Sequence, residues 1–315
     1  MDTSGCIVVT DMRNGIGNIL CEILVGLLFV RRLSMVTKKD YKYYALLTGQ
    51  VLKGHKIAYT EEHTTNNLPD PLSLSAVLPN INFITEMPPN MTNYHLLQRI
   101  NIASLSHVER LCVRVDSIDN LVAEIQDHKD LLSQIAYATA IRTYTMKKYK
   151  IVKFFGGSGG GGKTLGIHLR LHQIGDYVKT AFPTLAWYKK AVQEIVRRQN
   201  GVSPSRIFLV SGLSSSESDT QTIFNEVVNM LKTEFPDASK TEIVIVDHEP
   251  YYVDLFLLSI CDNMIMSNST FSLVPGLCTK GWLIHPNVVN FDFNVTNMKN
   301  KICLNIDDKP LYHNW

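Results

Sequence analysis

Apolar and polar residues follow two different periods along the second half of the chain. Their alternation over 166–171 predicts a strand, and an apolar stripe at helical spacing over 185–198 predicts a helix. Further strands are predicted at 207–211, 242–247, 264–267 and 282–285, with helices at 220–235 and 253–260. Strands that alternate with helices predict a parallel sheet with helices on both faces. Because ligands of such sheets sit at the carboxyl ends of the strands, functional residues are expected just after Val210, Val246 and Met266.

The first half opens with a strand, a glycine-bearing loop and a helix. Residues 6–10 predict a buried strand, residues 11–17 form a polar loop, and the apolar positions from Ile19 onward fall at helical spacing. Farther along, strands are predicted at 56–60 and 82–85, a loop at 66–79 and a helix over 121–144.

A glycine-rich tract, FGGSGGGGK at 155–163, separates the two halves. Six of its nine residues are glycine, which is typical of a flexible linker, either an interdomain hinge or an engineered loop replacement. The tract marks a domain boundary. We expect an N-terminal domain at 1–155, a linker at 156–163, a second domain at 164–287 and a C-terminal tail at 288–315.

The same tract matches a phosphate-binding pattern. Residues 157–164 fit G-x-x-x-x-G-K-S/T, in which backbone N–H groups cradle phosphates, Lys163 would reach the terminal phosphates and Thr164 would bind Mg²⁺. Such a loop needs a helix that begins at the lysine, because the helix N-terminus supplies the anion site. The alternation that follows predicts a strand instead. The linker interpretation is therefore favoured, and a P-loop nucleotide-dependent phosphotransferase stays as an alternative.

Composition narrows the class of protein. The chain has 315 residues, 45% hydrophobic and 19% charged, which fits a globular protein of about two ordinary domains or one large one. The 31 basic and 29 acidic side chains nearly cancel, so no nucleic-acid partner is expected. Six cysteines without a C-x-x-C pair argue against a zinc site or a disulfide framework and favour buried free thiols.

No membrane segment is expected in the chain as given. The longest apolar stretch, 19–30, contains Glu22 and is shorter than the ~20 residues that span a bilayer. It also lies too deep in the chain for a signal peptide. The expected location is soluble and cytoplasmic, or the Golgi membrane if an N-terminal anchor has been removed.

Three separated segments suggest a site for a sugar nucleotide. The first, 14–18, lies between the first strand and the first helix. Gly15 and Gly17 permit close approach of the backbone to a ligand, and Asn18 offers both a donor and an acceptor. The alternative is a simple helix-capping turn.

The second segment lies at the end of the strand predicted at 166–171. Strand alternation puts His168 and Arg170 on one face, where the guanidinium can bind a diphosphate through two oxygens. The alternative is a surface arginine paired with Asp176, which follows in the sequence.

The third segment, N-S-T-F-S at 268–272, follows a predicted helix and strand. The hydroxyls of Ser269 and Thr270 and the N–H groups of a helix start form an edge that favours anions, with Asn268 and Phe271 beside it. The alternative is ordinary capping of the helix.

Together the three segments resemble the α-1,2-fucosyltransferase family, glycosyltransferase family 11. The G-x-G-N-Q loop of that family corresponds to 15–19, and its H-x-R-R-G-D-Y segment corresponds to 168–170 and 175–177. The order and rough spacing fit over nearly the whole chain, and 312–315 resembles the closing Y-x-x-W. The long D-L-x-L-M-S-x-C-x-x-x-I-x-x-N-S-T-F-S-W-W segment is matched by Asp254, Leu255, Leu257, Ser259, Cys261, Ile265, Asn268, Ser269, Thr270, Phe271 and Ser272.

The chain departs from these motifs at several positions. Ile19 replaces the glutamine of the first motif, and Leu171 replaces the second arginine of the next. Residues 171–174 are inserted before Gly175, and the final Trp-Trp pair is 273–274, Leu-Val. These departures bear on acceptor choice and on activity. A non-catalytic relative that binds a sugar nucleotide or a glycan is therefore a second alternative.

The resemblance implies a GT-B-like α/β fold, in which two Rossmann-like domains have a cleft between them. The domain at 1–155 is then mainly the acceptor side, the domain at 164–287 binds GDP-fucose, and the tail packs back across. The implied reaction is an inverting transfer of L-fucose from GDP-fucose to the 2-hydroxyl of a terminal galactose of a glycan, with no metal or other cofactor.

The resemblance also implies roles for individual residues. Arg170 neutralises the β-phosphate of the departing GDP, and Asn18 is positioned from the other domain. Arg170 and His168 are the candidate catalytic residues, with His168 acting in acid–base chemistry or orienting its surroundings. Asp11 and Glu22 lie near the glycine loop, but no general base is assigned. The residues implied to bind the donor are Gly15, Gly17, Asn18, Arg170, Asp176, Asn268, Ser269, Thr270 and Phe271.

Overall fold

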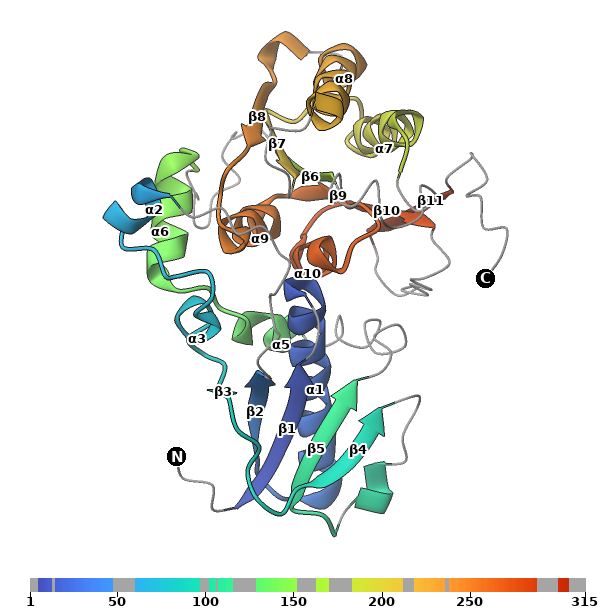
Figure 1. Ribbon diagram of the computed structural model, residues 1–315. Coiled ribbons are helices and arrows are strands. Elements are labelled where there is room, and N and C mark those ends of the chain that lie inside the picture. Colours follow the sequence, from blue (N-terminus) through green and yellow to red (C-terminus); the bar gives the residue numbers. More distant parts are fainter. Residues whose placement is uncertain are drawn as a thin grey trace. The chain divides into compact units, whose positions relative to one another are not determined.

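The computed structural model contains two compact units (Figure 1). It describes residues 5–12, 15–47, 60–96, 102–105, 107–115, 129–151, 163–169, 183–211, 218–235, 238–287 and 300–305. The first unit comprises Met1–His55, Pro69–Ala138 and Asp292–Met298, and the second comprises Lys56–Leu68, Thr139–Phe291 and Lys299–Trp315.

The first unit contains a five-stranded parallel sheet in the order β3-β2-β1-β5-β4. Its strands are β1 (Cys6–Met12), β2 (Tyr41–Leu47), β3 (Phe83–Ile84), β4 (Thr92–Leu96) and β5 (Arg110–Val115). Among the described residues, the helices of this unit are α1 (Ile16–Thr37), α3 (Leu74–Val77) and α5 (Lys129–Gln134), with a 3-10 helix, η1, at Ile102–Leu105.

Helix α1 packs closely on β1 and β2 because Gly26 has no side chain. A Cβ atom at this position would lie 2.5 Å from Thr10 Oγ1 and 2.5 Å from Tyr43 Cε2. The helix begins after Gly15 in an extended conformation, and it ends at Lys38, whose φ of 58° is left-handed. The strand predicted at 6–10 is therefore β1, and the apolar run predicted as a helix is α1, which packs on it.

The second unit contains a six-stranded parallel sheet in the order β11-β10-β9-β6-β7-β8. The strands are β6 (Thr164–Leu169), β7 (Arg206–Ser211), β8 (Glu242–Val246), β9 (Asn263–Ile265), β10 (Leu283–Asn287) and β11 (Lys301–Asn305). The chain starts in the middle at β6, runs outward to β8, and returns to the other side of β6 with β9. This is the strand order of a doubly wound Rossmann sheet, and its topological switch point lies between β6 and β9.

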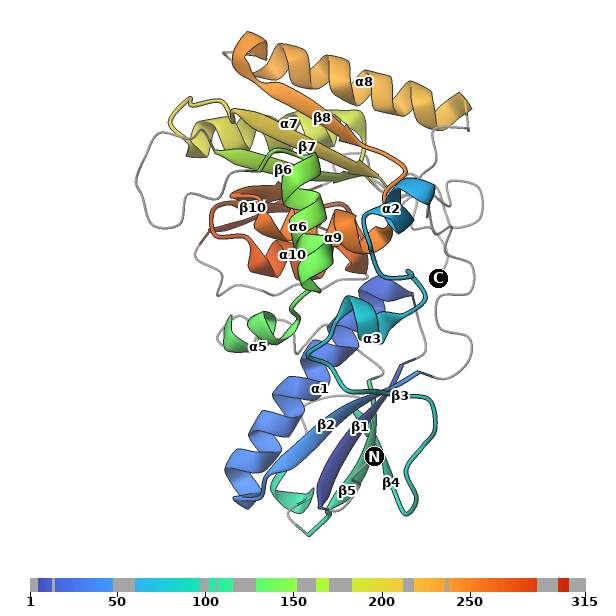
Figure 2. The same cartoon turned by 90° about the vertical axis from the view of Figure 1, so that its left-hand side faces the viewer.

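Helices cover both faces of this sheet (Figure 2). On one face lie α7 (Leu185–Arg198) and α8 (Ser218–Glu234), and on the other lie α9 (Tyr251–Ile260) and α10 (Thr270–Cys278). Successive residues of β6 point to opposite faces of the sheet and so contact different helices. Leu165 and Ile167 point into the core beneath α7 and α8, whereas Gly166 faces Leu258 of α9.

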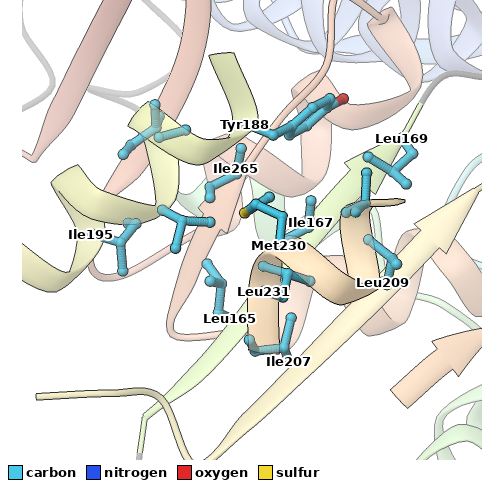
Figure 3. Close-up of a cluster of buried hydrophobic side chains, with 14 of the residues drawn as sticks. Leu165, Ile167, Leu169, Tyr188, Ile195, Ile207, Leu209, Met230, Leu231 and Ile265 are labelled. Atoms are coloured by element: carbon cyan, nitrogen blue, oxygen red, sulfur yellow. The ribbon is translucent and has the colours of Figure 1, made fainter. Parts of the chain in front are cut away.

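The core beneath α7 and α8 is apolar throughout (Figure 3). Helix α7 contributes Trp187, Tyr188, Ala191, Val192 and Ile195, which all lie on one stripe at helical spacing. Truncating a buried leucine or isoleucine in such a core to alanine costs about 2–5 kcal/mol. This packing fixes the strand ends at which the functional residues are expected.

The α/β prediction is confirmed: both units contain a parallel sheet with helices. From residue 164 to residue 287 every predicted strand and helix is present within a few residues. The sequence did not predict β2, β4, β5 or β11, and the loop expected at 66–79 contains α3. The strand expected at 56–60 lies outside the described residues except for Thr60.

The helix predicted over 121–144 is wrong in its described part. Helix α5 ends at Gln134, and a second helix, α6 (Thr139–Lys148), starts after a break. The break has a tertiary cause, because Ala138 N donates a hydrogen bond of 3.0 Å to Val77 O, far away in the sequence. An apolar stripe cannot show such a contact.

The division into units also differs from the expected boundary at 155. The second unit already begins at Thr139, because α6 packs on α9, and it includes Lys56–Leu68. The glycine tract at 156–162 lies outside the described residues. All six cysteines are free, and three of them are buried: Cys21, Cys112 and Cys261. Within the described ranges, no helix has the length and apolarity needed to cross a membrane.

Candidate functional site

The switch point of the second sheet carries a group of polar residues. His168 is the penultimate residue of β6, and Ser267 follows the end of β9 by two residues. Because β6 and β9 are neighbours, with Ile167 paired to Ile265, these two side chains meet at the carboxyl edge. Doubly wound sheets bind their ligands at this position.

His168 is held on three sides. Its Nδ1 lies 2.8 Å from Ser267 Oγ, and its ring stacks on Phe271 with centroids 5.2 Å apart and an interplanar angle of 26°. Its backbone carbonyl accepts a 3.1 Å hydrogen bond from the Tyr188 hydroxyl of α7. Burial raises the pKa of Tyr188, so that hydroxyl remains a donor. The imidazole is almost fully buried in a fixed orientation.

The N-terminus of α10 lies next to this histidine. Ser269 is the extended N-cap residue, and its side chain accepts a 3.2 Å hydrogen bond from Phe271 N. Ser269 N donates to Ser267 O at 2.9 Å, and Ser272 Oγ donates to Ser269 O at 3.0 Å. The N–H groups at a helix start carry partial positive charge. The arrangement therefore favours an oxyanion beside His168.

The structure brings together five of the residues singled out from the sequence: His168, Asn268, Ser269, Thr270 and Phe271.

The other residues predicted to bind the donor either belong to the first unit or lie outside the described residues. Gly15, Gly17 and Asn18 belong to the first unit, where Gly15 precedes α1 and the other two lie in its first turn. Arg170 and Asp176 lie outside the described residues.

The P-loop alternative is contradicted at Thr164. This residue begins strand β6, so no helix starts at Lys163. Its hydroxyl is also engaged, since it donates to Asp262 Oδ2 at 2.9 Å and accepts from Asp262 N at 2.9 Å. A phosphate loop needs a helix N-terminus and a hydroxyl available to Mg²⁺. In the part of the chain that the structure describes, no group of three His, Cys, Asp or Glu side chains could hold a metal ion.

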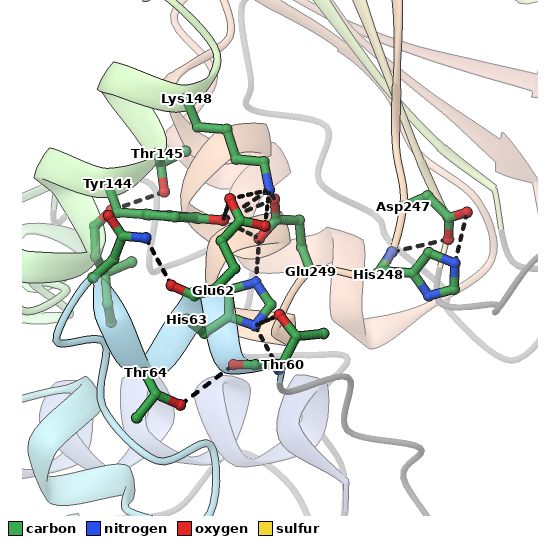
Figure 4. Close-up of polar contacts among 12 residues, drawn as sticks. Thr60, Glu62, His63, Thr64, Tyr144, Thr145, Lys148, Asp247, His248 and Glu249 are labelled. Carbon is green, nitrogen blue, oxygen red and sulfur yellow. Dashed lines mark hydrogen bonds and ion pairs between the residues drawn. The ribbon is translucent and has the colours of Figure 1, made fainter.

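A second polar cluster, centred on Glu249, follows β8 at the same edge of the sheet (Figure 4). The carboxylate is buried and accepts hydrogen bonds from the hydroxyls of Tyr149 at 2.7 Å and Tyr144 at 3.3 Å. Lys148 Nζ lies 2.9 Å from it, and His63 Nε2 lies 3.2 Å from it. These partners come from α2 (Glu61–Thr65) and from the end of α6. We call these five residues the Glu249 cluster.

Charges in and around the Glu249 cluster shift several pKa values. Burial, followed by the charge of Glu249, raises the pKa of Tyr144 to about 12, although a hydrogen bond to Lys148 opposes the rise. Burial alone would lower the pKa of Lys148, but hydrogen bonds to Tyr144, Glu249 and Glu62 raise it overall. Burial, together with the charges of Glu249 and Asp247, raises the pKa of Asp254 well above its usual range. The cluster therefore pairs Lys148 with Glu249, and its two tyrosine hydroxyls, whose pKa values are both raised, stay protonated.

Sequence reasoning missed the Glu249 cluster, although one signal pointed near it. Functional residues were expected just after Val246, and Glu249 stands three residues beyond that position. Its partners His63, Tyr144 and Tyr149 could not be found, because they lie in distant segments that carry no motif.

Comparison with known proteins gives only distant likenesses. No family model and no curated protein matches the chain. Among solved structures, it is similar to the α-1,6-fucosyltransferase NodZ soaked with GDP-fucose, at 13% identity and a TM-score of 0.47, over 90% of this chain and 96% of that one. It is also similar to a mutant of Arabidopsis thaliana FUT1 in complex with GDP, at 12% identity and a TM-score of 0.47, over 92% and 72% of the chains. A third, POFUT1 in complex with GDP-fucose, has 10% identity and a TM-score of 0.45, over 89% and 96%. With TM-scores below 0.5, these likenesses assign no substrate, and a functional proposal rests on the residues of this chain.

Proposed function

We propose that this chain is an inverting glycosyltransferase that moves L-fucose from GDP-fucose to the 2-hydroxyl of a terminal galactose of a glycan. One observation carries the proposal. The two segments that resemble the family motifs, at His168 and at Asn268–Ser272, are far apart in sequence yet lie together at the switch point between β6 and β9. A site for a nucleotide is expected at that point of a doubly wound sheet.

The proposed donor site uses the positive end of α10 and one guanidinium. The N–H groups at the start of α10 and the hydroxyls of Ser269 and Thr270 favour the diphosphate. Arg170, one residue beyond β6, supplies a two-pronged cation for the β-phosphate. Asp176 and, in the first unit, Gly15, Gly17 and Asn18 are proposed donor-binding residues on the resemblance alone.

The proposed reaction is a single displacement. The galactose 2-hydroxyl attacks C1 of fucose from the side opposite GDP, the bond from C1 to the β-phosphate oxygen breaks, and the configuration at C1 inverts. The hydroxyl proton leaves to a base that is not assigned. Negative charge grows on the β-phosphate in the transition state, so Arg170 interacts more strongly with that state than with the bound donor. Charge neutralisation by Arg170 is proposed to make a metal ion unnecessary.

Kinetics of Arg170 variants test this proposal. Arg170→Ala is expected to lower turnover on the order of 10²-fold or more and to weaken donor affinity less, as when other electrostatic stabilisers are removed. Arg170→Lys should keep only part of the parent's turnover, because the lysine ammonium lacks the planar guanidinium group that binds two oxygens at once. The measurement is GDP release from GDP-fucose and a galactoside in the presence of a chelator. Lys163→Ala, outside the proposed site, is the control and should leave turnover unchanged. Turnover of Arg170→Ala within about twofold of the parent, or a strict need for Mg²⁺, would refute the mechanism.

A non-catalytic relative is the second candidate. Helix α10 has Leu273 and Val274, each 3% exposed, where the family motif has a Trp-Trp pair, so smaller side chains fill this part of the interior. GDP-fucose binding without GDP release, across a panel of galactosides, would favour this candidate.

A further inference from the structure

We propose that Asn90 is the acceptor of an N-linked glycan when the chain is made in a secretory pathway. The side-chain amide nitrogen attacks C1 of the first sugar of a lipid-diphosphate-linked oligosaccharide. The bond from C1 to the diphosphate oxygen breaks, the lipid diphosphate leaves, and the amide nitrogen loses one proton. This modification is separate from the proposed transfer of fucose, and it concerns the first unit, to which Asn90 belongs.

The acceptor motif, N-x-S/T with a residue other than proline in the middle, occurs three times in the sequence. It stands at 90–92 (N-M-T), 268–270 (N-S-T) and 294–296 (N-V-T). The third lies outside the described residues. A glycan is bulky and polar, so a folded protein carries it on a surface side chain. The motif alone treats the first two sites alike, whereas their exposure in the structure separates them.

The segment 90–92 presents both essential side chains at the surface. Asn90 lies in a turn with a φ of 58°, a left-handed conformation that asparagine adopts more readily than most residues. Asn90 and Thr92 are exposed, whereas Met91 between them packs against the apolar cluster of β1, β2 and β3. The middle residue of the motif therefore holds the segment on the sheet while the two residues that define an acceptor remain in solvent.

The surroundings of this segment leave room for a glycan. Thr92 is the first residue of β4, which is the outer strand of the first sheet (Figure 1). In the part of the chain that the structure describes, no further strand pairs with β4 on the side away from β5. Within the same ranges, neither the Asn90 nor the Thr92 side chain makes a hydrogen bond or an ion pair. The amide nitrogen can therefore be modified without breaking a contact of the described fold.

Asn268 is the matched site at which the fold excludes a glycan. It is 6% exposed and lies between β9 and the start of α10. Ser269, the middle residue of this motif, caps α10 by accepting a 3.2 Å hydrogen bond from Phe271 N. A glycan on Asn268 would displace this packed junction, so folded molecules should not carry one.

Peptide mapping of the secreted protein tests the proposal. The full chain is secreted from cultured animal cells behind a signal peptide and treated with a glycan-releasing amidase in ¹⁸O-labelled water, which leaves labelled aspartate at each glycosylated asparagine. Mass spectrometry should find the label at Asn90 and not at Asn268. Thr92→Ala should remove the label at position 90, and Thr92→Ser, which keeps the hydroxyl, should retain it. Asn90→Asp tolerates the left-handed turn but has no amide nitrogen, so the intact protein should lose the mass of one glycan.

Two results would overturn the inference. One is an unlabelled Asn90 in the folded parent protein, and the other is a labelled Asn268 in that protein, because exposure would then not select the site. If the cells retain the chain, the same map is made on protein recovered from their membranes, and an unlabelled Asn90 there counts equally against it. The readout needs neither GDP binding nor fucose transfer, so failure of the proposed function would leave the label at Asn90 in place.

Discussion

The carboxyl edge of the second sheet carries two polar groups that differ in how their hydrogen-bonding capacity is used. In the Glu249 cluster a buried carboxylate accepts hydrogen bonds from two tyrosine hydroxyls and contacts one lysine and one histidine, so its partners are all side chains of the protein. At the switch point the groups are an imidazole, serine hydroxyls and the N–H groups of a helix start. Charge that is matched by internal donors holds distant segments together, whereas the positive end of a helix dipole retains an attraction for an anion even where a side chain caps one of its N–H groups.

The largest expected effect comes from breaking the Glu249 cluster. Glu249→Ala removes the acceptor of the Tyr149 hydroxyl, and a buried polar group left unsatisfied costs about 1–3 kcal/mol, whereas Lys148 keeps its ion pair with Glu62 at 3.1 Å. The free energy of unfolding should fall by that amount in urea titrations. Glu242→Ala is the control: its carboxylate is exposed and pairs with Arg206, and such pairs contribute about 1 kcal/mol or less. Equal losses for the two variants would show that the Glu249 cluster does not hold the fold.

A smaller effect should appear in the pH dependence of stability at Asp254. Burial and the charges of Glu249 and Asp247 raise the pKa of this carboxyl in the folded state. Its contribution is therefore fully present below the unfolded pKa of about 3.9 and is lost as pH rises toward the folded value, at up to about 1.4 kcal/mol per pH unit. Asp254→Asn removes that loss, so its stability relative to the parent should increase from pH 4.5 to 7.5. Parallel melting curves across this range would contradict the shift.

These two groups also show what the sequence could predict. The residues at the switch point could be predicted because the apolar residues of β6 and α7 recur at strand and helix spacing. The segment Asn268–Ser272 also follows a short apolar strand. The fold around it follows from local patterns that agree with the tertiary structure. The Glu249 cluster was out of reach. His63 and Glu249 are 186 positions apart, and their contact depends on how α2 packs in the second unit.

The first unit shows the same limit for secondary structure. Strand β2 reads YKYYALL, with only Lys42 as an exposed residue among apolar ones, so it lacks the alternation of a half-buried strand. It is a strand because β1 pairs with it along its full length, from Cys6 opposite Tyr41 to Met12 opposite Leu47. The break between α5 and α6 likewise depends on Val77, a partner that no local window includes.

The smallest expected effect on stability gives the sharpest separation between a structural and a ligand-binding role. Two helices of the second unit have side-chain caps of the same kind: Thr184 accepts from Trp187 N at 3.2 Å at the start of α7, and Ser269 accepts from Phe271 N at 3.2 Å at the start of α10. Replacing either with alanine removes one cap, which costs about 1 kcal/mol. Thr184→Ala and Ser269→Ala should therefore lower the unfolding free energy alike. Only Ser269→Ala should also weaken GDP binding, because only α10 begins beside His168 at the switch point. If calorimetry gave the same GDP affinity for both variants, the start of α10 would be an ordinary capped helix, and the donor site would have to be sought elsewhere on the sheet edge.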